Sequence, residues 1–274
     1  MLDSFKNTHD LINHILSVID EKVAQGIILS RKVLESPRAS AVMFLLGQHP
    51  AQKQFEPCIV LNKRSKKVRQ PGDLCCPGGS ISLGIDSLFS HLLQLPMFPL
   101  GRWPNWLNWR SRRPRDARCL SLLFATGLRE SFEEMRLNPM GVKFLGPLPS
   151  QRLDMFSRII FPLAGWISFQ KRFFPNWEVE KVVYIPLRNL LNADNYGRLQ
   201  LNVKNIISSG SNRLSEDFPC FHHKNSEEKE LLWGATYRIV MAFLQLIFAF
   251  TPPPVSSLPV FYGTLDENYL NGAG

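Results

Sequence analysis

Cysteine is scarce in this sequence, and its spacing matches no metal or disulfide pattern. The five cysteines are odd in number and include no C-x-x-C pair. Neither a zinc site nor a disulfide framework is therefore predicted. Free thiols are typical of a reducing compartment, so we expect a cytoplasmic protein.

Long apolar runs are also missing. The longest, IVMAFLQLIFAF at 239–250, is twelve residues long, whereas a membrane-spanning helix needs about twenty. We interpret this run as part of a core helix. Charged residues interrupt the N-terminal sequence, so no secretory signal is predicted there.

Acidic residues are outnumbered by basic ones. The chain has 23 Asp and Glu against 32 Lys and Arg, a formal net charge of +9. This balance favours an anionic partner, whether a phosphorylated metabolite, nucleic acid or an acidic membrane surface. Apolar residues make up 45% of the 274 positions, enough for one sizeable core or two small ones.

Apolar periodicity predicts alternating strands and helices. Helical spacing over 4–33 predicts an N-terminal amphipathic helix, and a last helix is expected from about Asn225 to Ala249, with Asn225 as its N-cap. The Pro-rich tail after it is expected to be irregular. A short helix is expected at 188–195. Strands are expected at 39–47, 57–65, 73–79, 142–149, 158–168, 179–187, 197–203 and 217–223.

The stretch LRESFEEM at 128–135 holds three glutamates on one predicted helix. Glu130, Glu133 and Glu134 are spaced i, i+3, i+4, so they share a face, and Arg129 can reach Glu133. Such a face is either solvated or binds a hard cation, because carboxylate oxygens suit Mg²⁺ or Mn²⁺.

The order strand, PGG turn and R-E-x-x-E-E helix resembles the box of the Nudix hydrolase superfamily. Gly79 matches the box glycine, and Arg129, Glu130, Glu133 and Glu134 match its core. The resemblance implies an α/β fold, a Nudix α/β/α sandwich with a mixed sheet. It also implies Mg²⁺ or Mn²⁺ held by the three glutamates, with Arg129 orienting them and a glutamate deprotonating water.

Three further segments resemble the coenzyme A diphosphatase branch. They are LNKRSKKVRQPGDLCCPGG at 61–79, WEVEKVVYIPLRNLL at 177–191 and LLWGATYRIVMAFL at 231–244. The resemblance implies hydrolysis of coenzyme A or acyl-coenzyme A to 4′-phosphopantetheine (or its acyl form) and adenosine 3′,5′-bisphosphate. No nucleic-acid partner is then expected. Substrate-binding positions would be Arg64, Ser65, Arg69, Gly78 and Gly79, and Asn62 stands where the branch usually has Thr.

The box itself departs from the usual pattern at three places. Ile85 occupies the first acidic position and only Asp86 beside it offers a carboxylate, while Arg136 replaces the box glycine after the acidic pair. An insertion at 87–120 separates Gly79 from the helix. Two alternatives therefore remain: another nucleoside diphosphate-linked substrate, or a degenerate module that binds a nucleotide or partner without catalysis.

The insertion at 87–120 has an unusual composition. It holds three of the six tryptophans and six arginines against Asp116 alone, a net charge of +5. It can elaborate the structure, cover the substrate, or contact a membrane or another chain. Because it is rich in Pro and Arg, we expect it to gate the substrate and not to build the core. The oligomeric state is left open.

The predicted organisation is a helical segment at 1–37, a hydrolase domain at 38–250 and a tail at 251–274. Glu178 and Glu180 are candidates for the general base, though two exposed strand-end acids are the commoner explanation. His222 and His223 are explained better by a strand end than by a metal site. Trp233 is expected in the core.

Overall fold

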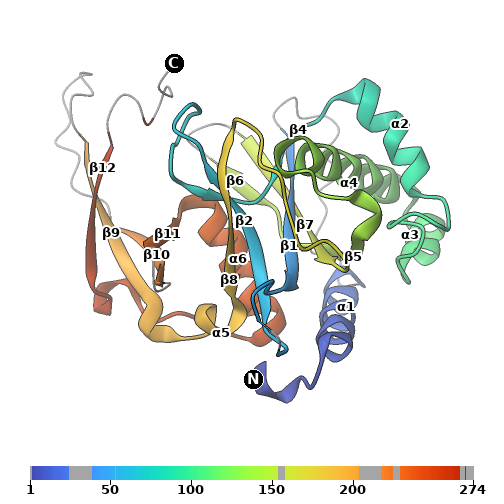
Figure 1. The fold of residues 1–274 in the computed structure, drawn as a ribbon. Helices are drawn as coiled ribbons and strands as arrows, with labels where there is room; N and C mark the ends of the chain where they lie inside the picture. The colour runs from blue at the N-terminus through green and yellow to red at the C-terminus, as the bar shows by residue number, and fades with distance from the viewer. Residues whose placement is uncertain are drawn as a thin grey trace.

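A computed structural model describes residues 2–24, 39–52, 54–153, 158–203, 217–224, 229–265 and 269 of the chain. Its centre is a mixed sheet of eight strands (Figure 1). The path β3-β2-β1-β7-β5 is extended by β4 on β1, β6 on β7 and β8 on β2. Only β1 and β7 run parallel among these pairs. The strands are β1 (Ala39–Gln48), β2 (Pro57–Arg64), β3 (Leu74–Cys75), β4 (Gly78–Ser80), β5 (Val142–Pro147), β6 (Gln151–Leu153), β7 (Arg158–Ile167) and β8 (Val179–Pro186).

Helices cover both faces of this sheet. On one face α4 (Pro114–Met135) packs closely, because Gly127 leaves room for the Met43 side chain of β1. On the other face α6 (Gly234–Phe248) packs through Phe243, whose ring lies 4.6 Å from that of Phe44. Helix α1 (Thr8–Ala24) packs beside α6 and against β5, where Ile19 meets Gly146. The mixed α/β fold expected from the sequence is confirmed.

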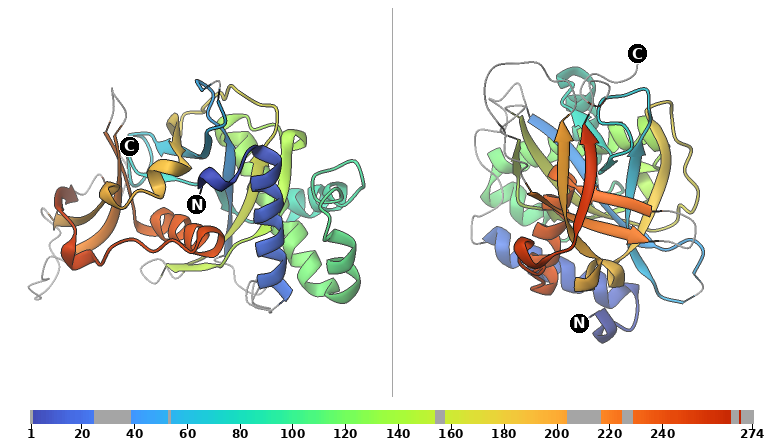
Figure 2. Two further views of the ribbon diagram at one scale, coloured as in Figure 1. Left: turned by 90° about the horizontal axis from the view of Figure 1, so that it is seen from below. Right: turned by 90° about the vertical axis from the view of Figure 1, so that its left-hand side faces the viewer.

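A second sheet adds a layer that the sequence analysis did not anticipate. Its order is β11-β10-β9-β12, with β12 parallel to β9. Helix α6 lies between the two sheets (Figure 2), and Tyr237 on α6 meets Tyr196 of β9. The strands are β9 (Tyr196–Val203), β10 (Asp217–Lys224), β11 (Lys229–Trp233) and β12 (Val260–Leu265). One helical turn, α5 (Leu187–Leu190), connects β8 towards this sheet.

Two predicted elements differ at the C-terminal end. The helix expected from Asn225 begins only at Gly234, because 229–233 form β11 and pair with β10. The proposed cap at Asn225 lies outside the described residues. The tail, expected to be irregular, contributes β12. The N-terminal helix is described as far as Ala24.

The insertion at 87–120 includes most of α2 (Leu83–Leu93), all of α3 (Trp106–Arg112) and the start of α4, and α2 and α3 lie on the outer side of α4 (Figure 1). Trp103, Trp106 and Trp109 are all buried, and the ring of Trp103 lies 5.1 Å from that of Phe144 in β5. The expectation that this segment builds no core was therefore wrong. Tryptophans supply so much apolar area that they outweigh the arginines around them.

Among the described residues, no helix combines the length and the apolar character that crossing a bilayer requires.

Candidate active site

The glycine turn of β4 lies directly against α4. A Cβ on Gly79 would come within 2.5 Å of the Glu130 carboxyl carbon, so the missing side chain makes room for this carboxylate. Gly78 has φ +152 and packs on β1, where a Cβ would lie 2.3 Å from the Ala41 carbonyl oxygen. Both positions require glycine, one for the site and one for the backbone.

Glu134 lies one turn further along α4 and is half-buried. Asn62 Nδ2 of β2 donates to its Oε2 at 2.8 Å, and the backbone N–H of Gly78 donates to it as well. Burial raises the pKa of Glu134 to about 8, and the charges of Glu130 and Glu178 add to this rise. Burial also raises the pKa of Glu130, against the lowering effect of Arg129.

Arg129 connects helix α2 to the site. Its Nε donates to Asp86 Oδ1 at 2.7 Å, and its Nη2 lies 2.9 Å from Glu130 Oε1. Asp86 is fully buried on α2 and also accepts from Thr126 Oγ1 and from the backbone N–H of Ser82. The carboxylate therefore partners Arg129 although it stands one place after Ile85, whose side chain is exposed.

Glu133 pairs with Arg129, as Glu130 does. Both of its oxygens lie 3.2 Å from Arg129 Nη1, and about half of the side chain is exposed. Across the described part of the chain, no three acidic, histidine or cysteine side chains gather as a ready metal-binding group. The three-glutamate metal site stays a prediction.

A hard cation nevertheless fits the carboxylates of Glu130 and Glu134. Each is half-buried, and the charge of Glu130 raises the pKa of Glu134. A divalent cation between such groups would offset their repulsion and keep both ionised. Oxygen-only donors of this kind suit Mg²⁺ or Mn²⁺.

The loop before β8 brings a further carboxylate to this cluster. The backbone N–H groups of Phe174 and Asn176 donate to the last carbonyls of α4, at Met135 and Glu134. These bonds satisfy carbonyls that a helix end leaves open. Glu178 follows on this loop and lies close enough to raise the pKa of Glu134.

Glu180 pairs with a lysine, unlike Glu178, whose charge acts on Glu134. It lies 3.5 Å from Lys63 Nζ, which also pairs with the buried Glu230 of β11. The structure thus separates two acids that the sequence left equivalent, and only Glu178 contributes charge at Glu134.

The helix ends at Arg136, in the left-handed conformation with φ 56. A glycine is the usual residue there, because an L side chain costs roughly 1–2 kcal/mol in this region. The Arg136 guanidinium lies over the Phe132 ring at 5.1 Å. Although Arg136 replaces the box glycine, the helix still ends in the left-handed conformation that glycine favours.

The predicted phosphate-binding residues lie on the loop after β2. Arg64 Nε donates to the Arg69 carbonyl at 2.7 Å, which closes the loop on itself. Ser65 donates through its hydroxyl to the Trp177 carbonyl and through its backbone N–H to the Glu178 carbonyl. The loop is thus tied to the strand end that carries Glu178, and the Arg69 side chain is exposed.

Asp73 anchors the other end of this loop. It accepts from Trp233 Nε1 at 3.0 Å and from the Tyr269 hydroxyl at 2.6 Å, and burial raises its pKa. Trp233 was expected in the core, but it is half-buried and its indole N–H is hydrogen-bonded to Asp73. His222 and His223 lie in β10, and burial lowers the pKa of both.

Sequence reasoning underrated Asn62, Asp86 and Glu178. Asn62 interrupts the apolar strand PCIVLNKR, and Asp86 is the only charged residue of α2. A lone polar residue in an apolar element is the signal that could have found the first two. Nothing local distinguishes Glu178 from Glu180.

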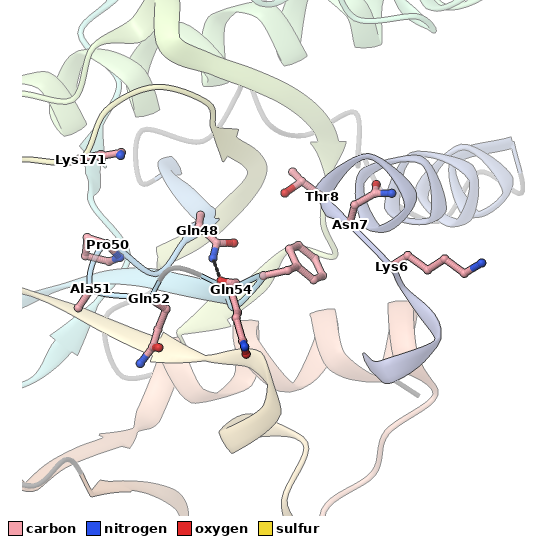
Figure 3. A pocket seen from close by; sticks show the side chains of 10 residues that line it. Lys6, Asn7, Thr8, Gln48, Pro50, Ala51, Gln52, Gln54 and Lys171 are labelled. Carbon is pink, nitrogen blue, oxygen red and sulfur yellow. Dashed lines mark hydrogen bonds between the residues drawn. The ribbon is translucent and has the colours of Figure 1, made fainter.

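The two surface depressions described lie away from these residues. One, of about 700 Å³, is lined by the start of α1, the loop between β1 and β2, and Lys171 (Figure 3). The other, of about 230 Å³, lies near Arg102 and Phe169. Neither is lined by any residue of the candidate site.

Comparison with known proteins gives partial similarities only. No protein-family model matches the chain, and no curated protein sequence matches it. A Nudix hydrolase from M. smegmatis, RenU, is 10% identical over 56% of this chain and 73% of its own, with a TM-score of 0.35. An Ap4A hydrolase from C. elegans is 9% identical over 56% and 83%, with a TM-score of 0.34.

The Nudix domain of Shewanella oneidensis NrtR, whose structure holds ADP ribose, is 15% identical over 63% and 85%, with a TM-score of 0.34. At scores this low, nothing about the chemistry of this chain follows from the similarity.

Proposed function

We propose that the protein is a Nudix-type hydrolase that cleaves the diphosphate of a nucleoside diphosphate-linked metabolite. The preferred substrate in this proposal is coenzyme A or acyl-coenzyme A. The proposal is supported by the resemblance of the box and its flanking segments, and by side chains that the fold brings to one place. Its strongest single support is Gly79, which packs directly against the carboxylate of Glu130.

Glu130 and Glu134 would hold Mg²⁺ or Mn²⁺. When bound, the ion would neutralise phosphate charge and lower the pKa of a bound water. Asn62 and the Gly78 backbone fix the orientation of Glu134 by hydrogen bonds. Arg129 fixes Glu130, and Asp86 fixes Arg129, so Arg129 and Asp86 act as positioning residues.

Glu178 is the general base in this proposal, because its carboxylate lies near the cluster and Glu180 pairs with Lys63 instead. It would accept a proton from the attacking water. Arg64, Ser65 and Arg69 would bind the substrate phosphates from their loop, since guanidinium groups pair with phosphate oxygens through charge-assisted hydrogen bonds.

One observation favours the non-catalytic alternative. Glu133 pairs with Arg129 and is about half exposed, and the described residues hold no group of three acidic, histidine or cysteine side chains placed to bind a metal. A degenerate module would bind nucleotides without cleaving them. Binding and cleavage measured on one sample separate the two functions.

The experiment is a panel of diphosphates incubated with the purified chain and Mg²⁺ or Mn²⁺, with products separated by chromatography. The panel holds coenzyme A, an acyl-coenzyme A, ADP-ribose, a dinucleoside polyphosphate and NADH. We expect coenzyme A or its acyl form to be cleaved fastest. If the other diphosphates are cleaved and coenzyme A is not, coenzyme A is not the substrate. If the protein binds these compounds but cleaves none of them, the proposal that it is an enzyme is wrong.

A further inference from the structure

Helix α2 exposes apolar side chains on the face opposite its buried one. Asp86, Ser90 and Leu93 point inward, whereas Ile85, Leu88 and Leu92 are 63%, 69% and 44% exposed. At 100° per residue the exposed three fall within about 60° of one another, so they form one continuous stripe. Leu95 and Met97 extend the apolar surface beyond the helix end.

The usual amphipathic arrangement is therefore reversed in this helix. Over residues 83–97 the only charged side chain is Asp86, and it is fully buried against Arg129. Seven of the thirteen large apolar side chains that are exposed in the described residues lie between Leu83 and Leu107. Such a concentration marks an interaction surface, because single exposed apolar residues are usually scattered.

Arginines follow this apolar segment in the sequence. Five of them are exposed between α2 and the first turns of α4: Arg102, Arg110, Arg112, Arg115 and Arg118. Leu107 and Arg110 are three residues apart on α3 and both exposed, so apolar and basic side chains share a face there. Helices α2 and α3 both lie on the outer side of α4 (Figure 1).

We propose that the surface formed by α2 and α3 docks on an acidic phospholipid membrane. Leucines and Ile85 would enter the boundary between headgroups and acyl chains, and the arginines would pair with lipid phosphates. The net charge of +5 over 87–120 selects this occupant over a second copy of the chain. Two such surfaces would repel one another, whereas an acidic bilayer attracts them.

The test is cosedimentation with vesicles of phosphatidylcholine alone, or of phosphatidylcholine and phosphatidylserine at roughly three to one. The full chain should bind the acidic vesicles and lose binding as salt rises. The variant Leu88→Asp/Leu92→Asp should bind at least about tenfold more weakly, because two charges would enter the interface. Arg110→Gln/Arg115→Gln should weaken binding to acidic vesicles only.

Tyr262→Asp is the matched control. Tyr262 is 75% exposed on β12, in the other sheet, so the substitution also places an acid at an exposed aromatic or aliphatic position. It should bind vesicles like the unaltered chain. Unchanged thermal melting of every variant confirms that none acts through unfolding.

Three results would overturn the proposal. One is failure of the unaltered chain to bind acidic vesicles. Another is equal binding by the Leu88→Asp/Leu92→Asp variant. The third is a dimer in light scattering that this variant breaks while vesicles stay unbound, which would assign the surface to a second copy of the chain.

Discussion

Replacing each of the two adjacent glycines in β4 by alanine should have different effects: Gly79→Ala should impair the candidate site, and Gly78→Ala should destabilise the fold. At Gly79 the new Cβ would lie 2.5 Å from the Glu130 carboxyl carbon, against an ordinary contact of at least 3.4 Å. Glu130 must then move by about 0.9 Å, the difference between these distances. The obstacle is the end of a flexible side chain, so the backbone can stay in place.

We therefore expect Gly79→Ala to change the free energy of unfolding by less than about 1 kcal/mol. A misplacement of about 1 Å at a reacting centre can cost roughly a hundredfold in rate, or about 2.7 kcal/mol of barrier. Mn²⁺ affinity, measured by calorimetry, should fall together with turnover of the best diphosphate in the panel.

Gly78→Ala is the matched comparison. Its Cβ would meet the backbone oxygen of Ala41 at 2.3 Å, and its φ of +152 disfavours an L residue. We expect a loss of about 3 kcal/mol or more of stability in urea. Normal Mn²⁺ affinity and turnover in Gly79→Ala, or a stable Gly78→Ala beside an unfolded Gly79→Ala, would refute this geometry.

Asp86→Asn should cost about 3 kcal/mol in urea unfolding, because it removes the buried partner of Arg129; a loss under about 1 kcal/mol would show that the pair is dispensable. Trp106→Ala should cost about 3–5 kcal/mol and the exposed neighbour Leu107→Ala under about 0.5 kcal/mol; equal effects would return the insertion to a surface role. Burial lowers the pKa of His223 from its ordinary 6.5. Below pH 6.5 the unfolded chain then takes up a proton that the folded chain does not, so stability falls as pH falls from there. His223→Gln should flatten this slope in unfolding at pH 5–7, and an unchanged slope would contradict the assignment.

Two strands of the central sheet, β1 and β2, were predictable because most of their residues are buried. Both contain an apolar run, AVMFLL in β1 and CIVL in β2, and the structure places them at the middle of the sheet. Helix α4 was predictable for a similar reason, since its apolar and acidic residues alternate with helical period. Local sequence decides such elements because one periodicity dominates over their whole length.

Strands β9 and β10 of the second sheet were predicted at 197–203 and 217–223, but β11 and β12 were not. KELLW at 229–233 consists mostly of helix formers, and it forms a strand because β10 pairs with it. Strand β12 lies in a Pro-rich tail and pairs with β9, whose partner residues stand 62 positions earlier in the chain. Tertiary pairing overrode local propensity at both places.

Much of the candidate site depends on contacts between distant segments. The spacing of Arg129, Glu130 and Glu134 was evident from the sequence. The role of Asp86 was not evident, because its contact with Arg129 depends on how α2 packs on α4, 43 residues later in the chain. The pairing of Glu133 with Arg129, by contrast, follows from their i, i+4 spacing and was predicted.

The central claim is that Glu134 belongs to a metal-dependent diphosphatase site. The measurement that tests it most directly is the initial rate of coenzyme A hydrolysis with and without Mg²⁺ or Mn²⁺. The unaltered chain, Glu134→Gln and Glu180→Gln are compared, since Glu180 pairs with Lys63 away from the cluster. The account predicts metal-dependent cleavage, a fall of at least about a hundredfold in Glu134→Gln, and a nearly unchanged rate in Glu180→Gln. Cleavage that needs no metal, or full turnover by Glu134→Gln, would contradict it.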